Sequence, residues 1–335
     1  MCTLCGPMRA AAFGASPGAD AFAAATAADP CARWLAAVVL GGQGHYAAAA
    51  TVLRELATRP RPLWSSLAAS TLASHRRQLG AHAAARRLDA VALRRCAGHA
   101  VRAGSAAGAE HVVGAGADEA IDPDGVDVAG ARADALTGLA ADALGLGELT
   151  AARRLITAAG HVATPSWRTA VRLDWVRAEA ALFAGRPHAA VGAARRAVRL
   201  ADEAGAARHA AKSRLVLAAS LHAGGQRDEA DELLHGLASA CPAHHLVPLR
   251  WPVEQLLGEL HGPSEHGRRH ADTACAALRF LFRRTDATVR TAAQSSRWVP
   301  SGGLRAGNSA ERSSAGEILG EICTGLCQGW SPRDR

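Results

Sequence analysis

The sequence predicts an all-α protein built from helical hairpins, and three observations lead to this expectation. Alanine accounts for 82 of the 335 residues, and all but one of the 38 basic residues are arginine. Alanine, leucine and arginine are strong helix formers. Aromatic residues make up only 4% of the chain, which is too few for a β-sandwich or barrel. The third observation is a recurring spacing of glycine and alanine.

In this spacing, a glycine is followed five residues later by an alanine and preceded by another alanine seven residues before it. In a helical hairpin, glycine allows the left-handed conformation that ends the first helix. Small residues on both sides of the turn let the two helix backbones approach. The five triplets are Ala37, Gly44 and Ala49; Ala73, Gly80 and Ala85; Ala140, Gly147 and Ala152; Ala178, Gly185 and Ala190; and Ala218, Gly225 and Ala230.

Other residues extend this pattern. Larger apolar residues stand nine positions after three of the glycines, prolines fall beyond two of the expected second helices, and Tyr46 follows Gly44 by two residues. Together these features resemble the tetratricopeptide repeat (TPR) family over residues 30 to 260. The resemblance implies a right-handed α-solenoid of antiparallel helix hairpins. The apolar residues and prolines concerned are Leu53, Ile156, Leu234, Pro60 and Pro242.

The predicted repeat domain spans residues 30–262 and has five recognisable units. Successive turn glycines are 36, 67, 38 and 40 residues apart, so the longest interval leaves room for a degenerate sixth unit around residues 98–127. Residues 1–29 are expected to form a flexible N-terminal segment, because they show no clear helical period. One additional helix is expected in residues 263–284, followed by a mostly flexible tail over residues 285–335.

Charge and cysteine usage favour a cytoplasmic protein that does not associate with membranes. The net charge of +8 is modest for this length, and a solvated arginine-rich surface accounts for it. The eight cysteines are irregularly spaced, which indicates reduced thiols. No unbroken apolar run of a secretory signal stands near the start. The longest uncharged stretch there, residues 34–53, is interrupted by three glycines and reads as two helices around a turn.

Patterns for catalysis and metal binding are weak. The single lysine, Lys212, lacks the glycines of a phosphate-binding loop, and no dinucleotide-binding fingerprint occurs. Two groups approach the spacing of metal ligands, but free thiols and surface histidines are the preferred interpretation. We therefore expect no enzyme activity, no cofactor and no metal. The two groups are Cys2, Cys5, Cys323 and Cys327, and His261, His266, His270 and Cys275.

The resemblance implies that a partner protein or peptide binds along the concave face formed by the first helix of each hairpin. We therefore predict a non-catalytic interaction scaffold or adaptor. The alternative is a nucleic-acid-associated regulatory protein that uses Arg-rich helix faces, since several Arg-Arg pairs would form a basic ridge if neighbouring repeats aligned them. By the resemblance, the partner-binding groove contains Trp34, Val38, Arg77, Gln78, Asp134, Arg172, Trp175, Glu179, Lys212 and His222.

Overall fold

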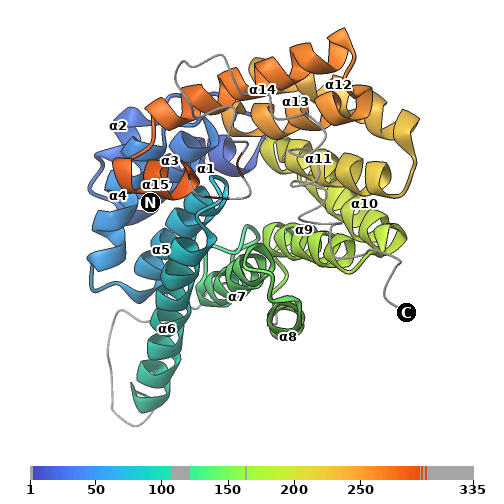
Figure 1. Ribbon diagram of the computed structural model, residues 1–335. Coiled ribbons are helices and arrows are strands. Elements are labelled where there is room, and N and C mark those ends of the chain that lie inside the picture. Colours follow the sequence, from blue (N-terminus) through green and yellow to red (C-terminus); the bar gives the residue numbers. More distant parts are fainter. Residues whose placement is uncertain (1–2, 107–120, 163, 295, 297–298, 300–335) are drawn as a thin grey trace.

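The computed structural model describes residues 3–106, 121–162, 164–294, 296 and 299, and all regular structure within these ranges is α-helical. Consecutive helices pack against each other along the chain, as a helical repeat does (Figure 1). The helices are α1 (Cys5–Phe13), α2 (Phe22–Ala25), α3 (Pro30–Gly42), α4 (Tyr46–Thr58), α5 (Pro62–Arg77), α6 (His82–Ala106), α7 (Val128–Gly145), α8 (Leu149–Gly160), α9 (Trp167–Phe183), α10 (Pro187–Glu203), α11 (Ala207–Ala223), α12 (Arg227–Ala243), α13 (Val247–His261), α14 (Glu265–Arg283) and α15 (Ala287–Gln294).

The predicted glycine and alanine columns are confirmed. Each of the five turn glycines lies between two helices of a hairpin and has a left-handed backbone, with φ between 66° and 83°. All ten alanines of the two flanking columns are 0% exposed. The small side chains therefore lie where the two helices of each hairpin approach, which is the arrangement that the spacing predicts.

The degenerate unit expected around residues 98–127 falls largely on residues 107–120, which lie outside the described part; in the described part of that range, α6 continues to Ala106 and a turn precedes α7. A sixth described hairpin is formed by α13 and α14, joined at Gly262, whose φ is 61°. Gly267 stands five residues after Gly262, at the offset where the other five hairpins have alanine. A Cβ at Gly267 would lie 2.0 Å from the Gly262 carbonyl oxygen. The helix expected in residues 263–284 thus exists, as the second half of this hairpin.

The N-terminal segment, expected to be flexible, contains α1 and α2. Met8 and Phe13 of α1 are buried, and the Phe13 ring lies 5.8 Å from that of Trp34 and 6.1 Å from that of His209. The Ala207 amide also donates a hydrogen bond to the Gly14 carbonyl, at 3.1 Å. The segment is helical because its apolar residues pack against α3, which follows it, and against α11, which lies far along the chain.

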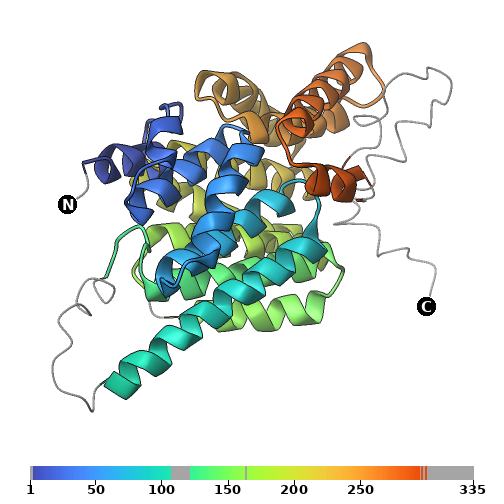
Figure 2. The ribbon, with the colours of Figure 1, turned by 90° about the vertical axis from the view of Figure 1, so that its left-hand side faces the viewer.

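The last described helices return to the first hairpins, as Figures 1 and 2 both show. The Ala47 amide at the start of α4 donates to the Arg284 carbonyl at 2.7 Å, and Arg54 pairs with Asp286 at 2.6 Å. Leu281 and Phe282 of α14 share one apolar cluster with Tyr46 and Leu79, and Val289 of α15 completes it. Helix α15 therefore lies within the segment that was expected to be a flexible tail; residues 300–335 lie outside the described part.

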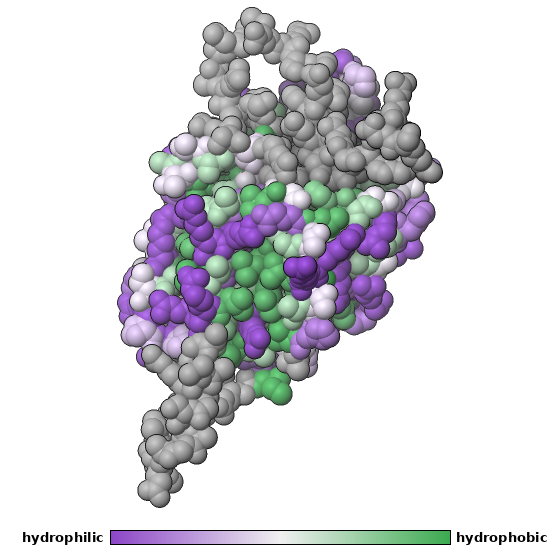
Figure 3. All heavy atoms as spheres, turned by 60° about the horizontal axis from the view of Figure 1, so that its bottom comes forward, coloured by the Kyte–Doolittle hydropathy of each residue, from purple (hydrophilic) through white to green (hydrophobic). Residues whose placement is uncertain are grey.

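The surface mixes apolar and charged residues. On the face seen in Figure 3, hydrophobic residues gather in a central area that hydrophilic residues surround. Within the described residues, no helix has both the length and the hydrophobicity needed to cross a membrane.

Candidate functional site

Six of the ten predicted groove residues line one central cavity of about 310 Å³. Helices α5, α9, α11 and α13, the first helices of four hairpins, provide most of its wall. An adjoining cavity of about 260 Å³ shares part of this lining and reaches α7. The first helices thus face a common interior space. The six residues are Arg77, Gln78, Arg172, Trp175, Glu179 and Lys212.

Trp175 and Lys212 form one wall of the cavity. The Trp175 side chain is held in place because its Nε1–H donates to Ser213 Oγ at 2.8 Å and its ring stacks on His209 at 5.6 Å. Lys212 Nζ lies 4.8 Å from the centre of the Trp175 ring, which is within the range of a cation–π contact. The indole therefore fixes the ammonium group at the cavity surface.

Arg77 is the best-neutralised cation of the cavity. It lies 3.0 Å from Asp89 and 2.6 Å from Asp142, two carboxylates with fully buried side chains, and it donates to the Gly138 carbonyl at 3.1 Å. Burial raises the pKa of Asp89, and Arg77 opposes that rise. Arg77 is therefore needed to keep the two buried carboxylates compensated.

Arg172 is compensated only in part. Its Nε lies 2.9 Å from Asp134, but the other oxygen of that carboxylate lies 2.7 Å from Arg168. One carboxylate thus serves two guanidinium groups. Burial lowers the pKa of Arg172, and Arg168 adds to the effect while Asp134 opposes it. Asp134 itself is buried behind the wall and does not line the cavity.

Arg208 and Lys212 carry charges that have no paired carboxylate. No carboxylate oxygen in the described part of the chain lies within 4.0 Å of either side-chain cation. Burial lowers the pKa of Arg208, and Arg172 lowers it further. Burial also lowers the pKa of Lys212, with Glu179 opposing the shift and Arg208 adding to it. Glu179 and Glu259 also line the cavity, but burial disfavours the charged forms of Arg208 and Lys212, and an entering anion that pairs with them would relieve this cost.

The remaining predicted groove residues lie elsewhere. Trp34 is 1% exposed, and its Nε1–H donates to Thr71 Oγ1 at 3.0 Å. Val38 is buried in the same cluster. Both belong to the core because α1 covers this side of α3. His222 is half-buried near the end of α11 and does not line the cavity; burial lowers its pKa, and Arg227 adds to the effect.

Sequence reasoning missed Arg208 and Trp251, which also line the cavity. Arg208 stands four residues before Lys212, so the two share one face of α11. This spacing is the sequence signal that places Arg208 beside Lys212. Trp251 belongs to α13, whose place as the first helix of a sixth hairpin was not predicted. Gly42 makes room for Arg208, since a Cβ there would lie 3.0 Å from its Nε.

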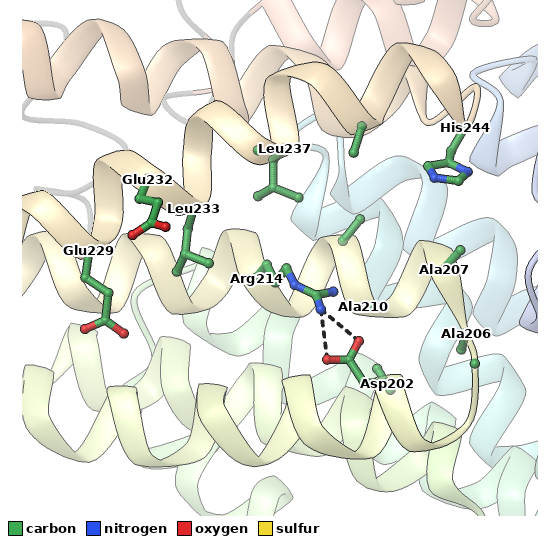
Figure 4. Close-up of a pocket in the computed structure, with 15 residues that line it drawn as sticks. Asp202, Ala206, Ala207, Ala210, Arg214, Glu229, Glu232, Leu233, Leu237 and His244 are labelled. Carbon is green, nitrogen blue, oxygen red and sulfur yellow. Dashed lines mark hydrogen bonds and ion pairs between the residues drawn. The ribbon is translucent and has the colours of Figure 1, made fainter.

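A second, open hollow of about 700 Å³ lies between α10, α11 and α12. Alanine and glycine form much of its lining. Its one arginine, Arg214, pairs with both oxygens of Asp202, at 3.0 and 2.9 Å (Figure 4). Glu229 pairs with Arg195 at 3.0 Å. Because its cation already has a carboxylate partner, this hollow is a weaker candidate for an anionic ligand than the central cavity.

Fold and site together define an all-α protein of consecutively packed helices with a cation-lined interior cavity. No protein-family model matches the chain, and no curated protein is significantly similar to it.

Proposed function

We propose that this protein is a non-catalytic interaction scaffold that binds an acidic segment of a partner protein or peptide in the central cavity. The observation that carries the proposal is the pair of cations, Arg208 and Lys212, that line the cavity without a carboxylate within 4.0 Å in the described chain. A partner carboxylate placed between them would form charge-assisted hydrogen bonds, each worth roughly 1.5–3 kcal/mol. Arg172, which shares the Asp134 carboxylate with Arg168, would add to the attraction.

The size of the cavity supports a short segment rather than a folded domain. A volume of about 310 Å³ is at the lower end of the range for small-ligand pockets. It accommodates one or two side chains, such as an aspartate or glutamate with an apolar neighbour against Trp175. Leu249 and Trp251 of α13 also line the cavity and would contact that apolar neighbour.

The proposal includes a TPR-like arrangement of the hairpins in a right-handed solenoid. The left-handed turn glycines, the buried alanine columns and the first helices facing one interior space support it. The scaffold is proposed to act in the cytoplasm. Cys96 and Cys241 are buried free thiols, which agrees with a reducing compartment.

The alternative of a nucleic-acid-associated regulator draws less support. Several members of the Arg-Arg pairs already have carboxylate partners: Arg86 lies 2.8 Å from Glu148, and Arg196 lies 3.0 Å from Asp174. Such pairs reduce the charge available to phosphates. Binding to nucleic acid that falls steeply with salt would favour this alternative over the scaffold.

The test uses the full chain and fluorescently labelled peptides of acidic, neutral and basic composition, measured by fluorescence anisotropy. Acidic peptides should bind most tightly, and Arg208→Ala and Lys212→Ala should each weaken binding at least tenfold, about 1.4 kcal/mol. Arg199→Ala is the matched control because Arg199 is exposed on α10, where its carboxylate partner among the described residues is Glu203. Equal binding of all three peptide classes, or an equal loss in the control, would exclude the proposed site.

A further inference from the structure

Four histidine side chains converge where α12, α13 and α14 meet. His235 comes from α12, His261 is the last residue of α13, and His266 and His270 lie one turn apart on α14. Every pair of rings is in contact range, with centroids between 4.5 and 6.2 Å apart. Three separate helices thus direct imidazole rings to one place, outside the central cavity.

The ring nitrogens have the spacing of metal ligands. One nitrogen from each of His235, His261 and His266 lies within 4.8 Å of the other two, and His266 Nε2 lies 3.2 Å from His270 Nε2. Nitrogens bound at about 2.0–2.1 Å to a tetrahedral Zn²⁺ ion are about 3.3–3.4 Å apart. Small rotations of the exposed His235 and His266 side chains would bring their nitrogens to that separation from His261.

Two carboxylates lie against the imidazole rings, as carboxylates that orient ligating histidines do in metal sites. Glu254 Oε2 lies 2.7 Å from His270 Nδ1, which leaves His270 Nε2 facing His266. Asp231 lies 3.1 Å from His261 Nε2 and 3.5 Å from His235 Nε2. Carboxylates placed in this way fix the ring orientation and raise the basicity of the ligating nitrogen.

We propose that His235, His261 and His266 bind one divalent transition-metal ion, with His270 as the fourth ligand and Asp231 and Glu254 orienting the rings. A set of neutral imidazoles suits Zn²⁺, and also Ni²⁺ or Cu²⁺. The ion would tie α12 of the fifth hairpin to both helices of the sixth. Its role would therefore be structural.

The experiment uses the untagged full chain after metal removal, with Zn²⁺ in competition with a chromophoric chelator. One Zn²⁺ per chain should bind, and the double variant His261→Ala/His266→Ala should lose this binding. Asp231→Asn and Glu254→Gln should weaken Zn²⁺ binding roughly 10- to 100-fold, because these carboxylates orient the ligating rings. His188→Ala is the matched control because His188 is exposed on α10, away from the cluster.

Co²⁺ substitution separates this site from the cysteines of the chain. Tetrahedral nitrogen ligation gives visible bands without an intense thiolate charge-transfer band. If the double variant loses helix content by circular dichroism, His235→Gln takes its place, since His235 is exposed on α12. Binding that survives these changes, a thiolate band, or no stoichiometric binding at all would overturn the proposal.

Discussion

Replacing Arg77 with methionine tests how the cavity wall is held together. In the native protein, Arg77 lies 3.0 Å from Asp89 and 2.6 Å from Asp142, and both carboxylates are fully buried. The Met side chain fills similar space but leaves two buried acids without their cation. Breaking a buried ion pair by removing one partner costs about 3–5 kcal/mol, so Arg77→Met should lower the free energy of unfolding by that amount at neutral pH.

The loss of unfolding free energy in Arg77→Met should depend on pH. Burial already raises the pKa of Asp89 in the native state, and without Arg77 the rise becomes larger. A carboxyl whose pKa is raised by folding binds more protons in the folded than in the unfolded state, so its contribution to stability is present at low pH and is lost as the pH rises. Each proton involved changes the unfolding free energy by about 1.4 kcal/mol per pH unit between the two pKa values.

The assay is urea unfolding followed by tryptophan fluorescence and circular dichroism at about pH 5 and about pH 8. Arg77→Met should recover part of its lost stability at the lower pH. Arg199→Met, which removes an exposed arginine of α10, should stay within about 0.5 kcal/mol of the native protein. A loss below about 1 kcal/mol, or the same pH dependence in variant and native protein, would refute this account of the buried acids.

Two further changes probe packing and binding. Gly41→Ala should destabilise the protein by about 1–3 kcal/mol in a thermal melt, because the added Cβ would lie 2.0 Å from Nε2 of the buried His75. Gly192→Ala is the control: no atom lies within 4 Å of the added Cβ, so this change should be neutral or stabilising. Trp175→Ala should weaken binding of acidic peptides, because the apolar neighbour of the acidic side chain loses the indole wall of the cavity, while helix content stays unchanged by circular dichroism. Unchanged binding by that folded variant would mean that the cavity is not the binding site.

The hairpins were predictable from sequence because their geometry is local. The turn at Gly185, for example, needs a left-handed residue and small neighbours at Ala178 and Ala190, all within a dozen positions. The same locality explains why Arg172, Trp175 and Glu179 line one cavity: they lie at helical spacing on one face of α9. These residues share a cavity with residues of other hairpins because the first helix of each of these hairpins lines the same interior space.

What could not be predicted depends on contacts between distant parts of the chain. Trp34 was placed in the groove because nothing in the sequence shows that Phe13 would cover it. The histidines 261, 266 and 270 were grouped from their spacing, but His235 belongs to the preceding hairpin. Only the packing of consecutive hairpins brings its ring to within 5.8 Å of that of His261.

The return of the last helices to the first hairpins has a consequence for how the molecule melts. In an open repeat array, the terminal units contact one neighbour only, so the ends fray before the middle. Here the Arg54–Asp286 pair joins residues 232 positions apart, and the Ala47 amide is bonded to the Arg284 carbonyl. Each end therefore serves as the cap of the other. Unfolding of one end removes the cap from the opposite end, which favours a single cooperative transition over stepwise loss of repeats.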